Sequence, residues 1–297
     1  RASASPSSSE SDRAAKTIMV RAPSAAVLRL KARALVSERE VLAESNPLWV
    51  SPDAPKSLWG DLPGHSLRTD GTGSPEDYFR YARDVAALEV IALTDHDHWG
   101  VLFMDQHPEI WQGIQREVAR FHKPGRFVTL LAYEWTSWIH GHRHVVYFED
   151  EGLVHSSLDP EVTTPRQLWA RLRGQKALTF AHHSAGNPIP TNWTFAPDPE
   201  LEPVTEIMSV HGASEALDSP ARLSGAIPGN FVRDVLDHGY RFGFIGSGDG
   251  HDGHPGLAHL SPVYRWMRRR DGSEAMGTGG LAGICADEVT REGVARF

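Results

Sequence analysis

The sequence predicts an α/β protein built on a mostly parallel β-sheet, either open or closed into a barrel. From residue 58 onward, short aliphatic runs of strand length alternate with amphipathic stretches of helix length. His, Asp or Glu stands beside most of these strands, at one end. Such residues typically mark a ligand site at the rim of an α/β sheet. The 297 residues suit one barrel of about 250 residues plus an appendage.

Composition excludes several classes of protein. Hydrophobic residues make up 40% of the chain, enough for a sizeable core, and the net charge is −8 without a long basic run, which argues against a nucleic-acid partner. The single Cys285 excludes an internal disulfide framework. No apolar run approaches the about 20 residues of a membrane helix, and no signal peptide is visible. We therefore expect a soluble protein, with a cytoplasmic location favoured, and leave open whether the natural N-terminus is included.

The N-terminal part is expected to form an appendage. Residues 1–16 are rich in Ser and Ala and predict a disordered tail. Residues 17–52 predict a small β-strand appendage, with a barrel domain over 53–297. Its strands are expected at 17–20, 26–36 and 41–50, with a hairpin turn at 37–40. A helix over 27–36 remains the competing interpretation.

Helix boundaries in the main domain are marked by caps and prolines. Ser74 and Thr164 are expected N-caps, and each is followed by a proline, which is favoured in the first helical turn. The helices are expected after Ser74, at about 108–122, after Thr164 as far as Gly174, and at 230–238. The chain ends within a possible helix over 288–294, so we expect that a C-terminal portion of the domain is missing.

Strands are expected at 88–93, 127–132, 144–148, 177–181, 204–210, 241–245 and 281–285. The connection 186–203 carries five prolines and Trp193, and reads equally well as a binding loop or as a variable surface excursion. Trp99, Trp135, Trp138 and Trp193 stand near strand ends and could wall an aromatic pocket.

Residue types that bind metals gather at the strand ends. They are Asp95, His96, Asp97 and His98; Glu134; His140, His142 and His144; His182 and His183; Glu206 and His211; and Asp249 and His251. Their convergence from separate strands predicts a metal site more strongly than any single histidine would. Imidazole and carboxylate without thiolate suit Zn2+, Mn2+ or Fe2+. Asp95 and Asp97 could orient imidazoles or simply cap a turn.

Several segments together resemble the polymerase-and-histidinol-phosphatase (PHP) family, in its branch of larger proteins with an N-terminal β extension. The similar segments are Gly60-Asp-Leu-Pro-Gly-His65-Ser, Thr69-Asp70-Gly71, Ala92-Leu-Thr-Asp-His96-Asp, Tyr133-Glu134-Trp135, Gly141-His-Arg-His144-Val-Val, Ala181-His182-His183 and Gly246-Ser-Gly-Asp249-Gly-His251. Together they cover about residues 58–290, in the order and spacing of the family. The resemblance implies a distorted (β/α)7 TIM-like barrel with two or three divalent transition-metal ions.

Carried over position by position, the resemblance implies three ligand sets. They are His65, Glu134 and Asp249; Glu134, His144 and His182; and Asp70, His96 and His251. We also expect catalytic roles for Glu134, Asp249 and His211, and substrate contacts for Arg143, His183 and His254. The last three and His211 are candidates for orienting the substrate or protonating the leaving group. His142 and His183 adjoin chosen ligands, so either could replace its neighbour.

The implied function is a metal-dependent hydrolase that cleaves a small phosphomonoester or diester with a metal-activated hydroxide. The expected partner is a small phosphorylated substrate, without nucleic acid or membrane, and the oligomeric state is open. Pro63 departs from the pattern, because the family has a histidine there and proline offers no ligand atom. Two alternatives remain: a degenerate, non-catalytic metal- or ligand-binding module, and a metallohydrolase acting on amides or carboxyl esters.

Overall fold

The computed structural model describes residues 26–36, 38–45, 48–51, 57–100, 102–221, 223–257 and 279–296. The chain divides into two compact units, residues 1–56 and 57–297. The predicted disordered tail and the strand expected at 17–20 lie outside the described residues. Nothing in the structure therefore bears on those two predictions.

The N-terminal unit contains two small antiparallel sheets. Strand β1 (Ala26–Leu28) pairs with β4 (Leu48–Val50), and β2 (Lys31–Val36) pairs with β3 (Arg39–Glu44). Val36 lies opposite Arg39, which confirms the expected hairpin, but its turn is shorter than the predicted 37–40 because Arg39 and Glu40 already belong to β3. The competing helix over 27–36 is wrong, and the two longer strands expected here are each broken into two.

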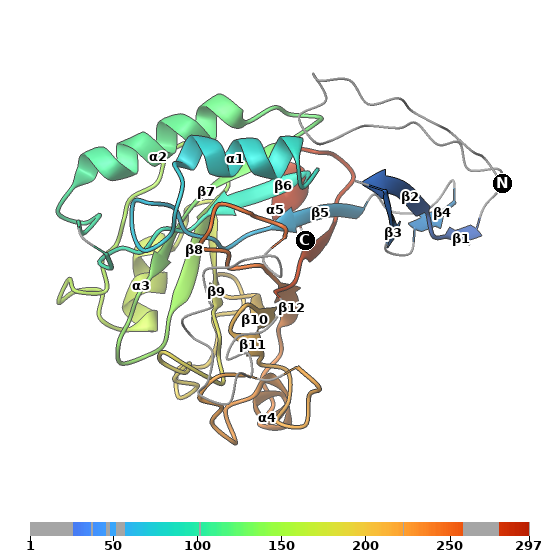
Figure 1. Cartoon of the computed structure of the whole chain (residues 1–297). Helices are drawn as coiled ribbons and strands as arrows, with labels where there is room; N and C mark the ends of the chain where they lie inside the picture. Colours follow the sequence, from blue (N-terminus) through green and yellow to red (C-terminus); the bar gives the residue numbers. More distant parts are fainter. Residues whose placement is uncertain are drawn as a thin grey trace. The chain divides into compact units, whose positions relative to one another are not determined.

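The unit from residue 57 is organised by one strongly curled mixed sheet that forms a half-barrel (Figure 1). Within the described ranges its strands are β5 (Ser57–Asp61), β6 (Val90–Leu93), β7 (Val128–Trp135), β8 (Arg143–Tyr147), β9 (Ala177–Ala181), β10 (Val204–Ser209), β11 (Gly212–Ala213), β12 (Gly243–Gly246) and β13 (Ala282–Cys285). The sheet order is β11-β10-β9-β8-β7-β6-β5-β13, and β12 pairs with β10. The predicted α/β fold class is confirmed.

The sheet is mixed rather than mostly parallel, because β8 runs antiparallel to both β7 and β9. Strand β7 ends at Trp135 and β8 begins at Arg143. A parallel pair needs a crossover of about a dozen residues or more, which this short connection cannot supply. Strand β8 therefore presents its first residues, not its last, at the edge where β7 ends.

Three helices cover the convex face of the sheet: α1 (Pro75–Asp84), α2 (Pro108–Phe121) and α3 (Pro165–Leu172). Both expected N-caps are confirmed, since the Ser74 and Thr164 side chains accept hydrogen bonds from the backbone three residues on. Figure 1 shows α1 and α2 side by side over β6 and β7. Two short helices follow, α4 (Val232–Asp237) and α5 (Arg291–Ala295). Within the described part of the chain, no helix combines the length and the apolar character needed to cross a membrane.

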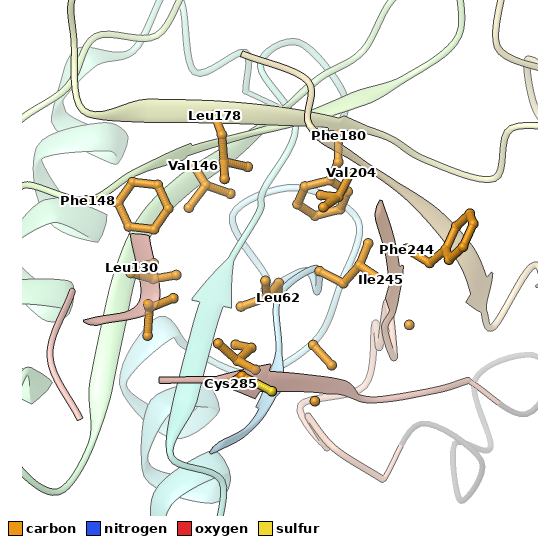
Figure 2. Close-up of a pocket in the computed structure, with 15 residues that line it drawn as sticks. Leu62, Leu130, Val146, Phe148, Leu178, Phe180, Val204, Phe244, Ile245 and Cys285 are labelled. Carbon is orange, nitrogen blue, oxygen red and sulfur yellow. The ribbon is translucent and has the colours of Figure 1, made fainter. Parts of the chain in front are cut away.

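The concave face of the sheet carries a second apolar layer, which surrounds a cavity of about 330 Å³ (Figure 2). Leu130, Val146 and Phe180 from three neighbouring strands line this cavity. Side chains two residues apart in a strand point to the same face. His144 and His182 therefore point to the concave face as well, and the cavity forms an apolar floor for the polar cluster described next.

Candidate metal centre

Three neighbouring strands place the centre of the cluster. Glu134 on β7 lies directly opposite His144 on β8, and His144 in turn lies opposite Phe180 on β9, two residues before His182. The backbone of His96, just after β6, forms a bridge with that of Glu134. The register of the sheet thus brings together side chains that stand far apart in the sequence.

Glu134 is fully buried and lies among histidines. His142 Nδ1 is 2.6 Å from Oε1, and His65 Nε2 is 3.2 Å from Oε2. His96 Nδ1 lies 3.7 Å from Oε1, and His144 Nδ1 lies 3.9 Å from Oε2. One carboxylate therefore reaches imidazoles on both sides through its two oxygens.

Asp249 forms the second contact point of the cluster. It follows β12 in the left-handed backbone region, with φ of 52°, which is uncommon for residues other than glycine, although Asp adopts it more readily than most. His65 Nε2 lies 3.1 Å from its Oδ1. His182 Nε2 and His211 Nε2 lie 3.4 and 3.1 Å from its Oδ2.

Asp70 forms the third contact point, at the more exposed side of the cluster. His65 Nδ1 and His96 Nε2 each lie 3.7 Å from Oδ1, and His251 Nε2 lies 3.5 Å from Oδ2. The His65 ring stacks on both His96 and His251, with centroids 4.4 and 4.2 Å apart.

The donor atoms in each of five groups lie within 4.8 Å of one another, close enough to hold a metal ion. The groups are His65, Asp70, His96 and His251; His65, Glu134 and Asp249; Glu134, His144 and His182; His96, Glu134 and His142; and His182, His183 and His211. The residues of all three predicted ligand sets are thus brought together. The last two groups contain His142 and His183, so the ambiguity between neighbouring histidines persists in the structure.

The donor set fits cations. Neither nitrogen of the fully buried His144 has a hydrogen-bond partner among the described residues. Such a group is costly to bury unless it finds another ligand. Burial alone would raise the pKa of the Glu134 carboxyl, but neighbouring imidazoles, His96 first, hold that pKa well below its usual range. A buried carboxylate that stays ionised supplies the deprotonated oxygen donor that divalent transition metals require.

Several imidazoles have pKa values shifted in opposite directions. Burial lowers the pKa of His144 and of His183 well below the usual value, and the neighbouring His182 adds to this. Burial acts the same way on His182, but Glu206 and Asp249 outweigh it and raise its pKa well above the usual value.

Glu206, on β10, was noted among the strand-end residues but belonged to none of the predicted ligand sets. Both of its carboxylate oxygens lie 2.9 Å from His182 Nδ1, and the Ser247 hydroxyl donates to it over 2.6 Å. Its carboxylate fixes the ring so that Nε2 faces Asp249. The sequence signal that could have identified Glu206 was a carboxylate inside the expected strand 204–210, which follows the strand that leads into His182.

Asp95 and Asp97 support loops rather than the ligand imidazoles. Asp95 accepts hydrogen bonds from the backbone and hydroxyl of Ser66 and from the Thr69 hydroxyl, over 2.6 to 2.8 Å. These bonds hold the loop that carries His65 and Asp70. Asp97 accepts from Ser157, from the Thr136 backbone and from His98 Nδ1.

The predicted substrate residues lie in different surroundings. Arg143 is fully buried and its Nε donates to Glu202 over 2.8 Å, on the face of β8 opposite His144. His183 lies inside the cluster, with Nε2 3.3 Å from His142 Nδ1. The side chain of His254 is 42% exposed and pairs with Asp252. Only His183 of these three belongs to one of the five ligand groups.

Of the four tryptophans expected near strand ends, two lie at the cluster. Trp135 is fully buried in the convex core, and Trp193 packs with Tyr240 and Phe242. Trp99 stacks on His96, and Trp138 stacks on Trp99. Trp99 and Trp138 are therefore the two of these tryptophans that stand beside the cluster.

Comparisons with known proteins find a family model and several relatives. A family described as "Protein of unknown function (DUF3604)" matches residues 92–222. An uncharacterized protein of Chlamydia pneumoniae is 28% identical over 223 residues, which are 72% of this chain and 35% of that protein. An uncharacterized protein of Chlamydia trachomatis is 27% identical over 200 residues, 64% of this chain and 31% of that protein. The chain thus spans about a third of the length of these relatives.

A crystal structure of a two-domain protein from Bacteroides vulgatus is similar in fold. That protein is described as containing a predicted PHP-like metal-dependent phosphoesterase. The match has a TM-score of 0.50 and 16% sequence identity, and covers 82% of this chain and 63% of that one. At this identity the likeness concerns the fold alone: the half-barrel of this chain is similar to the fold of a protein that is described as PHP-like.

Proposed function

We propose that this protein is a metal-dependent phosphoesterase that hydrolyses small phosphate mono- or diesters at the cluster around Glu134. The observation that carries the proposal is the shared carboxylate, since Glu134 belongs to three of the five ligand groups. A carboxylate with two oxygens can bridge two cations, the arrangement used by many enzymes that cleave phosphate esters. The description of the similar Bacteroides vulgatus protein adds support from fold.

Mn2+, Zn2+ or Fe2+ would suit the nitrogen and oxygen donors, with two or three ions in all. Divalent ions held there would lower the pKa of a water molecule and offset the negative charge of phosphoryl oxygens. The protein's own part is to hold the donors rigidly and to keep the floor of the site apolar, since the cavity beneath is lined by aliphatic and aromatic side chains.

His211 is the proposed proton donor to the leaving oxygen. Its side chain is 17% exposed, and its Nε2 lies 3.1 Å from Asp249 Oδ2. It therefore stands between the buried carboxylate and solvent, where a leaving group would depart. His183, inside the cluster, is proposed to orient the substrate.

The experiment is a hydrolysis assay with 4-nitrophenyl phosphate and bis(4-nitrophenyl) phosphate in the presence of each metal. Asp249→Ala is expected to abolish hydrolysis while circular dichroism stays unchanged. Glu109→Ala is the matched control, because this carboxylate stands on α2 with its side chain 67% exposed. Full activity of Asp249→Ala, or cleavage of carboxyl esters and amides alone, would overturn the proposal.

Pro63 favours a second candidate, a non-catalytic metal-binding module. Position 63 adjoins the cluster, since its carbonyl accepts a hydrogen bond from the Asp249 backbone over 3.2 Å, yet proline contributes no ligand atom. This candidate predicts metal binding without turnover, and a gain of activity in Pro63→His. Pro63→Ala is the control, because it removes the ring without adding a ligand.

A further inference from the structure

The rings beside the cluster form a continuous column. His65 stacks on His96 with centroids 4.4 Å apart, and His96 stacks on Trp99 at 5.2 Å with planes 25° apart. Trp99 stacks on Trp138 at 4.7 Å, with planes only 12° apart. The column thus leads from candidate ligands at one end to Trp138 at the other.

Trp138 ends this column at the surface. It is 48% exposed, an unusual position for the largest apolar side chain. One of its faces stacks on Trp99, and among the described residues no second ring stacks on the other face. The neighbouring Ile139 is 75% exposed and extends the apolar surface.

A buried chain of hydrogen bonds fixes the orientation of Trp138. Its indole Nε1 donates to His98 Nε2 over 3.1 Å, and His98 Nδ1 lies 2.9 Å from Asp97 Oδ1. Asp97 is fully buried, so it favours the tautomer of His98 whose Nε2 accepts from the indole. An exposed indole held by buried groups is preorganised, and preorganisation lowers the entropy cost of binding.

The stacked indoles of Trp99 and Trp138 also lie close to the cluster around Glu134. The His142 ring meets both indoles edge-on, with centroids 6.4 Å from Trp99 and 6.2 Å from Trp138. The same His142 places Nδ1 2.6 Å from Glu134. One imidazole therefore separates the indole pair from the shared carboxylate.

We infer that Trp138, backed by Trp99, is a stacking platform for a planar aromatic group of the substrate, so that the preferred substrates are aryl or nucleobase-bearing phosphate esters. This inference rests on the proposed function, because it concerns the substrate of the proposed phosphoesterase. The near-parallel geometry of the column favours a flat ring as its next member, because offset-stacked rings of this spacing attract one another. The ring selects the substrate and takes no part in bond cleavage.

The test compares phenyl phosphate with butyl phosphate in the wild type and in Trp138→Ala. The variant is expected to raise KM for phenyl phosphate by about three- to tenfold while kcat and the KM for butyl phosphate stay unchanged. Trp138→Phe should recover most of the loss, since it keeps a ring. Trp49→Ala is the matched control, because Trp49 is 63% exposed and stands on β4 of the N-terminal unit.

Equal effects of Trp138→Ala on both esters would overturn the inference and leave the proposed function standing. If Trp138→Ala raised the KM for a glucose phosphate as much as the KM for phenyl phosphate, the assignment to an aromatic ring would be overturned. If neither ester is hydrolysed, the proposed function fails, and tryptophan fluorescence titration with phenylphosphonate and butylphosphonate decides the inference. Tighter binding of phenylphosphonate that is lost in Trp138→Ala supports it, and equal binding of both overturns it.

Discussion

The carboxylate of Glu206 lies 2.9 Å from Nδ1 of His182 through both of its oxygens. Metal-binding histidines commonly donate their second ring nitrogen to a carboxylate, which fixes the tautomer and raises the basicity of the ligand nitrogen. The partnership therefore supports Nε2 of His182, which faces Asp249, as a ligand atom.

Replacing Glu206 by Gln should weaken metal binding without unfolding the protein. The amide keeps the size of the side chain but loses the negative charge, and loss of such a supporting group typically costs about 10- to 100-fold in metal affinity. Isothermal titration with Zn2+ measures the change. Glu109→Gln is the control, because Glu109 is exposed. Glu202→Gln is unsuitable as a control, because Glu202 pairs with the buried Arg143. Unchanged affinity would contradict the supporting role of Glu206.

His144→Leu should have opposite effects with and without metal. In metal-free protein the leucine replaces a buried imidazole that lacks a hydrogen-bond partner within the described residues, so the variant should unfold at the same or a higher temperature. A metal at 100 times its Kd stabilises a protein by about 2.7 kcal/mol. The rise in Tm on adding metal should therefore be clearly smaller in the variant, as differential scanning fluorimetry would show. An equal rise in both proteins would exclude His144 as a ligand.

Arg143→Ala should destabilise the fold. Arg143 and Glu202 are both almost fully buried and paired at 2.8 Å. Removal of one partner leaves a buried charge, which costs roughly 3–5 kcal/mol. Urea unfolding measures this loss, and Arg143→Met combined with Glu202→Leu should recover much of it. A variant of normal stability with a raised KM would instead support the substrate contact that was expected for Arg143.

Asp61 should make the metal-free protein less stable as pH rises. Burial raises its pKa to about 7 from 3.8, despite hydrogen bonds from the Gly248 and Gly256 backbones. Between these pH values the folded state holds a proton that the unfolded state has lost, so stability falls across that range, by roughly 4 kcal/mol for such a difference. Relative to Asp61→Asn, the wild type should lose unfolding free energy from pH 4 to pH 7. Parallel pH profiles for the two proteins would refute this.

Local features could be predicted from the sequence, and features of long-range pairing could not. Ser74 and Thr164 were predictable as N-caps because a cap depends only on the next few residues. Glu134 was predictable as a strand-end carboxylate because it follows an aliphatic run closely, whereas its expected place in two ligand sets came from the family resemblance. The antiparallel direction of β8 depends on which strands pair, and the alternation of elements does not encode it. The link from Glu206 to His182 likewise joins residues 24 positions apart and exists only through the parallel pairing of β9 and β10.

Metal content per chain is the most direct test of the shared centre at Glu134. Protein purified without chelator is analysed by elemental mass spectrometry, alongside Glu134→Gln, which removes charge from three ligand groups while keeping the side-chain size. We predict about two or three transition-metal ions per wild-type chain and a loss of more than one ion in the variant. A folded wild-type chain without metal, or a variant that retains the full content, would contradict the proposed centre.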